Sequence, residues 1–146
     1  MYRNRRILWL VVALAAVLLL PACTQVQQAA KESPAKVEQI EGSEFKRVTL
    51  TAKAAERLDV QTAVVQEVGA NGSRRLTVPY AAVLYGLNGE TWLYTNPESL
   101  VYVREPITIL SIRDDTATLV EGPAPGTAVV TVGVAELFGA ETGVSK

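Results

Sequence analysis

The stretch VLYGLNGETWLYT, residues 83–95, decides the fold that this sequence predicts. Two runs rich in branched and aromatic residues flank a turn that contains Asn88-Gly89, which is a strong short-range signal for a β-hairpin. A two-residue loop would place Tyr85 opposite Trp92, whereas a four-residue loop would place Val83 opposite Trp92. A shift of two positions preserves the face of a strand. Both registers therefore predict one shared face for the same four residues, Val83, Tyr85, Trp92 and Tyr94.

Strands are expected on both sides of this hairpin, separated by turns of glycine, proline, asparagine and aspartate. Residues 74–85 are typical of one long strand, in which Pro79 must lie at an edge, a bulge or a strand start because it cannot donate to a ladder. Thr51 and the helix formers that follow it, residues 52–58, predict one short helix. The other expected strands are residues 46–50, 60–68, 101–112, 116–120 and 128–132, with a single helical turn at 135–138.

These elements predict a mainly all-β fold, a small β-barrel or β-roll of about seven strands with one short helix. We expect this domain at residues 45–139, after a signal helix and a flexible tether. Residues 140–146 are expected to form a disordered tail.

The start of the chain has the pattern of an export signal. Three arginines precede the uncharged run Ile7–Leu20, whose 14 residues are fewer than the roughly 20 that a spanning helix needs. The run ends with Leu20-Pro21-Ala22 before Cys23, which resembles a bacterial lipobox, where cleavage occurs before a cysteine that carries a diacylglycerol thioether. We expect a signal peptide at residues 1–22 and lipid attachment at Cys23. The alternative is a plain signal peptide or an uncleaved anchor helix, with Cys23 as a bystander.

Residues 23–44 form the expected lipidated N-terminus and tether. This segment is polar and mixed in charge, and it holds Pro34 and Gly42, so it cannot bury enough apolar surface to fold alone. Two or three acyl chains on one residue would give stable membrane binding. The pattern therefore predicts an extracytoplasmic protein that is lipid-anchored to the cell membrane, either in the periplasm or on the outer face of the cytoplasmic membrane.

The composition argues against several classes of function. The chain has no histidine and one cysteine, so it lacks a His-based triad and, once Cys23 is lipidated, a thiol nucleophile or a soft metal ligand. Residues 1–22 hold three of the 14 basic side chains and none of the 15 acidic ones, which leaves the rest at a net charge of −4. That charge argues against a nucleic-acid partner. We expect a non-catalytic protein with no cofactor other than the acyl chains.

Two groups of side chains are candidates for a site. Asp114-Asp115 is interpreted as a solvated turn, because no loop of alternating oxygen ligands surrounds it. The aromatic residues of the strands fit core packing or a surface that binds a partner, and both interpretations stay open. The candidate partner surface consists of Tyr80, Trp92, Tyr94, Tyr102 and Arg104.

Two separate stretches, residues 47–68 and residues 78–109, resemble the periplasmic adaptor subunits (membrane fusion proteins) of bacterial efflux pumps. The first is similar to the opening of the adaptor's membrane-proximal domain, and the second is similar to its closing part. The second likeness continues through residues 122–137, where Gly122, Gly126, Val129 and Val130 match the family's pattern. A full adaptor has a β-barrel domain, a lipoyl domain and a helical hairpin between these parts, whereas this chain has only residues 69–75.

The resemblance implies a membrane-proximal domain that stands alone and docks on an integral membrane transporter of the efflux type. Without the hairpin, such a chain would not bridge to an outer-membrane channel. A second hypothesis is a lipoprotein that binds a small molecule in a cavity lined by the hairpin aromatics. A purely structural role in the cell envelope is the third.

Overall fold

The computed structural model describes residues 33–143 except residues 71–72. The expected signal peptide, its motif Leu20-Pro21-Ala22 and the lipid site Cys23 lie outside these described residues. No helix in the described part is long and apolar enough to cross a membrane.

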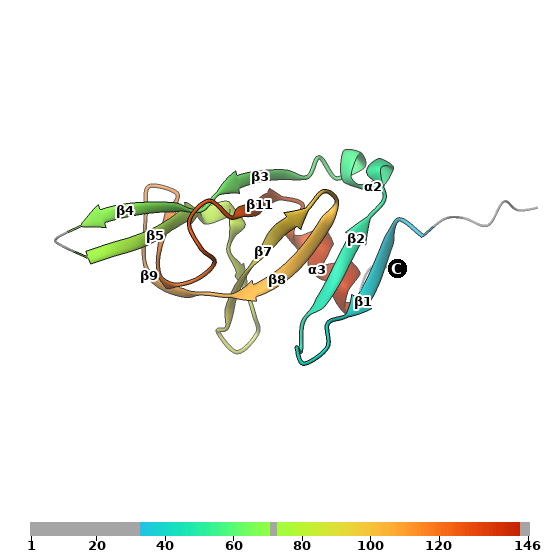
Figure 1. Ribbon diagram of the computed structural model, residues 1–146, viewed down its shortest axis with the longest axis horizontal. Coiled ribbons are helices and arrows are strands. Elements are labelled where there is room, and N and C mark those ends of the chain that lie inside the picture. The colour runs from blue at the N-terminus through green and yellow to red at the C-terminus, as the bar shows by residue number, and fades with distance from the viewer. Residues whose placement is uncertain (1–32, 71–72, 144–146) are drawn as a thin grey trace, which may run out of the picture. The chain divides into compact units, whose positions relative to one another are not determined.

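Eleven strands of the described chain form two antiparallel sheets (Figure 1), which confirms the mainly β fold. The larger sheet has the order β1-β2-β8-β7-β11-β3, and β6 pairs with β7. Its strands are β1 (Ala35–Gln39), β2 (Lys46–Leu50), β3 (Gln61–Val64), β6 (Leu84–Tyr85), β7 (Thr91–Glu98), β8 (Val101–Pro106) and β11 (Ala128–Val132). The smaller sheet has the order β4-β5-β10-β9. Its strands are β4 (Gln66–Ala70), β5 (Ser73–Pro79), β9 (Thr108–Arg113) and β10 (Thr116–Glu121).

The two sheets are open, so the predicted barrel is wrong. Two of the predicted strands, residues 60–68 and 101–112, each bend and continue in the other sheet. The bends fall at Val65 and Ile107, which are 2% and 6% exposed and belong to the same core cluster between the sheets. A strand that changes sheets at a corner is a common way to build a two-sheet fold. The third long strand, residues 74–85, is interrupted by the 3-10 turn η2 (Tyr80–Ala82) directly after Pro79.

Strand β7 is buried on both faces near its middle, which explains why the bulky residues Trp92, Leu93 and Tyr94 follow one another there. Successive side chains of a strand point to opposite faces. Leu93 therefore packs into the cluster that lies between the sheets, and Tyr94 packs into the second cluster beneath the helices. On β11, Val129 likewise packs into the cluster between the sheets, and Val130 packs into the second cluster.

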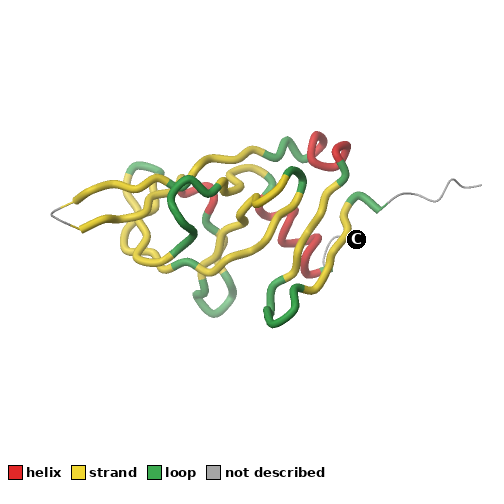
Figure 2. Tube along the Cα trace, in the orientation of Figure 1, coloured by secondary structure: helices red, strands yellow, loops and turns green. Residues whose placement is uncertain are grey.

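The helices α2 (Ala52–Arg57) and α3 (Val134–Thr142) pack with the second cluster, and Figure 2 shows them as the longer red segments of a mostly yellow tube. Helix α2 confirms the prediction at residues 52–58, because the Thr51 hydroxyl accepts a hydrogen bond from the Ala54 amide at 3.2 Å. Helix α3 is much longer than the predicted turn at 135–138. It also extends into the predicted disordered tail, because the side of the helix that carries Leu137 and Glu141 is buried against the rest of the domain.

The predicted tether also contains ordered structure. Its residues 35–39 form β1, which pairs with β2 in a register from Ala35↔Leu50 to Gln39↔Lys46. The Thr51 amide donates to the Pro34 carbonyl at 3.0 Å and extends this pairing by one step. Local composition did not predict β1 because its order comes from hydrogen bonds to β2 and not from burial of its own side chains.

The predicted hairpin is present, but its register is wrong by one position. Leu84 pairs with Trp92 and Tyr85 pairs with Thr91, so the loop is residues 86–90. The Gly86 amide closes this loop by donating to the Glu90 carbonyl at 2.8 Å. A shift of one position reverses the face of every side chain. Tyr85 therefore does not share a face with Trp92 and Tyr94.

Candidate functional site

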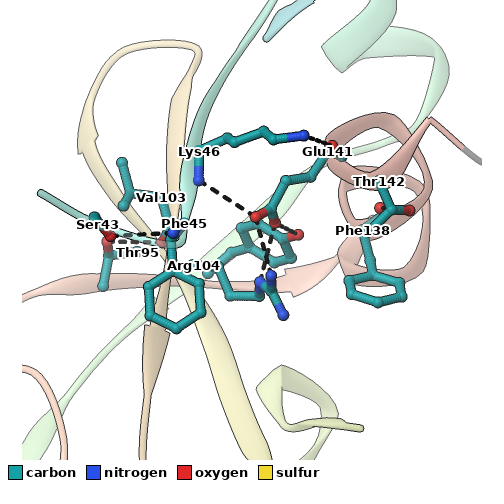
Figure 3. A network of polar contacts seen from close by, with 10 residues as sticks. Ser43, Phe45, Lys46, Thr95, Val103, Arg104, Phe138, Glu141 and Thr142 are labelled. Carbon is teal, nitrogen blue, oxygen red and sulfur yellow. Dashed lines mark hydrogen bonds and ion pairs between the residues drawn. The ribbon is translucent and has the colours of Figure 1, made fainter. Parts of the chain in front are cut away.

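A buried ion pair joins helix α3 to the larger sheet (Figure 3). Glu141 lies in the last turn of α3 and is 3% exposed, and Arg104 on β8 points toward its carboxylate. The Nη2 of Arg104 donates to Oε1 of Glu141 at 3.1 Å. The Nε lies 3.0 Å from Oε2, but its N–H makes no aligned hydrogen bond, so this second contact is electrostatic. A carboxylate is unfavourable near a helix C-terminus, and the guanidinium compensates for it.

Tyr94 and Lys46 complete the contacts of Glu141. The Tyr94 hydroxyl donates to Oε2 at 2.5 Å, and the Lys46 amide donates to Oε1 at 3.4 Å. The Lys46 ammonium donates to the Glu141 backbone carbonyl at 3.4 Å, one of the carbonyls that a helix end leaves unpaired. Burial, followed by the hydrogen bond to Glu141, raises the pKa of Tyr94 well above its usual range, so the phenol stays protonated and donates.

Three aromatic rings surround the guanidinium of Arg104. Its central carbon lies 4.5 Å from the ring centroid of Trp92, 4.8 Å from that of Phe45 and 5.3 Å from that of Phe138. Cations over aromatic faces at such distances are attracted by the ring quadrupole. The side chain is 12% exposed, so the rings and Glu141 take the place of most of its water. We call Arg104, Glu141, Tyr94 and the three rings the arginine cluster.

An open groove of about 720 Å³ adjoins the arginine cluster and shares Phe45 and Trp92 with it. It lies between the turn that joins β1 to β2 and the loop that joins β6 to β7, two loops that protrude on the same lower side of the molecule in Figure 1. Its lining residues are Glu44, Phe45, Tyr85, Gly89, Glu90, Thr91, Trp92, Pro106, Ile107, Thr108 and Ile109. We call this feature the aromatic groove.

The loop at one side of the groove is held by Glu90. Its carboxylate accepts hydrogen bonds from the Asn88 amide at 3.1 Å and from the Asn88 side chain at 3.2 Å. Hydrogen bonds to the Glu90 carboxylate, from its own backbone first and then from Asn88, lower its pKa. Glu90 is therefore ionised at neutral pH.

The structure divides the predicted partner surface among different environments. Tyr94 and Tyr102 are core residues, with exposures of 0% and 4%, and Trp92 and Arg104 belong to the arginine cluster. Only Tyr80 is substantially exposed, at 41%, and its ring lies edge-on to that of Tyr85 with centroids 6.4 Å apart. The alternative interpretation, core and cross-strand packing, is therefore confirmed for Tyr94 and Tyr102.

Several residues of these sites were missed. Glu141 lies two residues beyond the end of the expected domain, Phe138 lies one residue before that end, and Phe45 is its first residue. The spacing of Leu137 and Glu141, four residues apart, is the signal that could have placed both on one face of a helix. A single acidic residue in a C-terminal segment does not by itself indicate a buried partner, so this signal is weak.

The paired aspartates form a turn, as expected. Asp114 and Asp115 lie between β9 and β10 with φ values of 46° and 60°, and both are exposed. Aspartate and asparagine are the non-glycine residues that tolerate this left-handed region best. In the described part of the chain, no group of three or more His, Cys, Asp or Glu side chains is arranged to hold a metal ion.

Comparison of the chain with models of known protein families, with curated proteins and with solved structures finds no match.

Proposed function

We propose that this chain is a lipid-anchored, extracytoplasmic accessory subunit that docks on an integral membrane transporter of the efflux type and acts by binding rather than by catalysis. The export and lipobox pattern that ends at Cys23 supports the lipid-anchored, extracytoplasmic location. The resemblance of residues 47–68, 78–109 and 122–137 to an adaptor's membrane-proximal domain supports a transporter as the partner.

The observation that carries the proposal is how these two stretches combine. Strand β2 of the first stretch pairs with β8 of the second, and β3 of the first pairs with β11 of the second. The stretches thus interleave in one sheet, and only the β4–β5 hairpin connects them. A membrane-proximal domain that lacks the other adaptor domains needs this kind of self-contained sheet.

The lengths of the helices limit the proposed role. Within the described residues, the two α-helices, α2 and α3, have 6 and 9 residues, and neither resembles the long hairpin with which a full adaptor reaches outward. We therefore propose stabilisation or gating of a transporter at the membrane surface, and not the bridging of two membranes.

Photo-crosslinking in native membranes tests this proposal. A photoreactive residue would replace Leu87, which is fully exposed at the tip of the loop between β6 and β7, and a matched one would replace Lys53 on the exposed side of α2. We expect the full-length chain to crosslink to one integral membrane transporter from at least one position. Recovery of uncrosslinked monomer from both positions would count strongly against the proposal. A Cys23→Ala variant should leave the membrane and lose the crosslink.

A second candidate function is a lipoprotein that binds a small molecule near the membrane. The aromatic groove favours it, because Tyr85 and Trp92 of the hairpin line a hollow of about 720 Å³. Small-molecule sites usually have volumes of about 300–1,000 Å³. Direct binding measurements distinguish this function from docking, since they require no transporter.

A further inference from the structure

The aromatic groove combines ring surfaces with negative charge. Tyr85 is 49% exposed, and Trp92 and Phe45 are partly buried, so each presents some ring surface at the groove. Glu44 and Glu90 are exposed and line the same groove from the two opposing loops. Within the described residues, neither carboxylate lies within 4 Å of a basic group.

The positive charge nearest to these rings is already neutralised. The guanidinium of Arg104 stacks on Phe45 and Trp92 but is paired with the Glu141 carboxylate, and Arg104 does not line the groove. The net charge at the groove is therefore set by Glu44 and Glu90. Glu90 is also fixed in place, because Asn88 donates two hydrogen bonds to its carboxylate.

We propose that the aromatic groove binds an organic monocation, such as a quaternary ammonium compound with an aromatic or alkyl body. The cationic head would lie over the Tyr85 ring between Glu44 and Glu90, and the apolar body would lie against Trp92 and Ile109. Aromatic faces recognise quaternary ammonium groups through the ring quadrupole. A bare divalent metal ion is a poor alternative, because hard cations take about six or more oxygen ligands in proteins. This inference does not rest on the proposed docking function.

The probe for this proposal is benzyltrimethylammonium, whose charge does not depend on pH. Its binding to the full-length chain in zwitterionic nanodiscs would be measured by calorimetry, with empty nanodiscs subtracted. The matched ligand is benzyldimethylamine N-oxide, which has nearly the same shape and no net charge. We expect saturable binding of the cation and clearly weaker binding of the N-oxide.

Variants of the groove make the test specific. Tyr85→Leu should weaken cation binding roughly 2–5-fold, the range of an exposed cation–π contact. Glu90→Gln should weaken it by about 2–5-fold, as expected for one exposed charge pair, and added salt should reduce this difference. Glu56→Gln, which removes the same charge from exposed α2, should leave the affinity unchanged.

Three results would overturn the proposal. They are the absence of saturable binding of the cation, equal affinities for the cation and the N-oxide, and equal affinities for Tyr85→Leu, Glu90→Gln and Glu56→Gln. Thermal unfolding of each variant shows whether it is folded, and so separates a true loss of binding from a loss of fold. Transporter crosslinking in native membranes is independent of these nanodisc results, so failure of this inference and failure of the docking proposal can be told apart.

Discussion

The Nη2 of Arg104 on β8 donates to the Glu141 carboxylate on α3 at 3.1 Å, across 37 residues of sequence. This contact, together with the rings around it, fixes the helix that covers the second core cluster. Removing one partner of a buried pair leaves an uncompensated charge, whereas replacing both with apolar residues often does little harm.

We therefore expect Glu141→Ala to lower the free energy of unfolding by about 3 kcal/mol, because Arg104 would remain mostly buried without a counter-charge. Urea denaturation of the full-length chain measures this change. The exposed Glu136→Ala on the same helix is the control and should change stability by less than about 0.5 kcal/mol. The double variant Arg104→Met/Glu141→Leu should be more stable than Glu141→Ala. If it is equally unstable, the ion pair does not explain the loss.

Tyr94→Phe removes one hydrogen bond to the Glu141 carboxylate and leaves the ring in place. Hydrogen bonds to charged groups contribute about 1.5–3 kcal/mol, so we expect a loss in that range by chemical denaturation. Tyr102→Phe is the matched control, because Tyr102 is also in the core and its hydroxyl makes no hydrogen bond to another described residue. Similar losses of unfolding free energy in both variants would mean that the hydrogen bond from Tyr94 to Glu141 does not stabilise the fold.

The fold should lose stability in alkaline solution because of Tyr94. Burial, then the hydrogen bond to Glu141, raises the pKa of this phenol in the folded state, whereas the unfolded chain releases the proton near pH 10. The contribution of Tyr94 is therefore complete below about pH 10 and falls above it by about 1.4 kcal/mol per pH unit. Urea unfolding between pH 8 and pH 11 (about the range that brackets ordinary tyrosine titration) tests this. The loss of unfolding free energy per pH unit should be smaller in Tyr94→Phe. An unchanged loss would contradict the assignment of this pH dependence to Tyr94.

The sequence predicted those parts of the fold whose signals are local. Thr51 and its following helix formers, the turn at Asp114-Asp115 and the hairpin around Asn88-Gly89 are all present because capping and turn chemistry depend on neighbouring residues. Tertiary contacts decide the parts that were wrong. Strand β1 is ordered by β2, the last turn of α3 is ordered by Arg104, and the bends at Val65 and Ile107 exist because two sheets enclose one core.

The candidate site was less accessible to sequence analysis than the fold. Arg104 and Trp92 were both identified, but as members of an exposed surface and not as parts of a buried cluster. Their environment depends on Glu141, which no local pattern connects to them. The aromatic groove depends in turn on the loop at residues 86–90, whose length differs by one residue from the longer of the two predicted loops.

Gly86 holds the hairpin close to Trp92, and its substitution should disturb the groove. A Cβ at this position would lie 2.5 Å from Oε2 of Glu90 and 2.6 Å from Cη2 of Trp92, closer than real contacts allow. We expect Gly86→Ala to lower the free energy of unfolding by about 1–3 kcal/mol, the usual effect of overpacking. It should also change Trp92 fluorescence, since the ring must move.

Gly69→Ala on β4 is the control, because a Cβ there would meet no atom within 4 Å. Its backbone is compatible with alanine, so the variant should be neutral or more stable by about 0.4–1 kcal/mol. Chemical denaturation with tryptophan emission as the signal measures both variants in one experiment. If Gly86→Ala matches Gly69→Ala in stability and emission, then the loop between β6 and β7 does not pack on Trp92 as the structure places it.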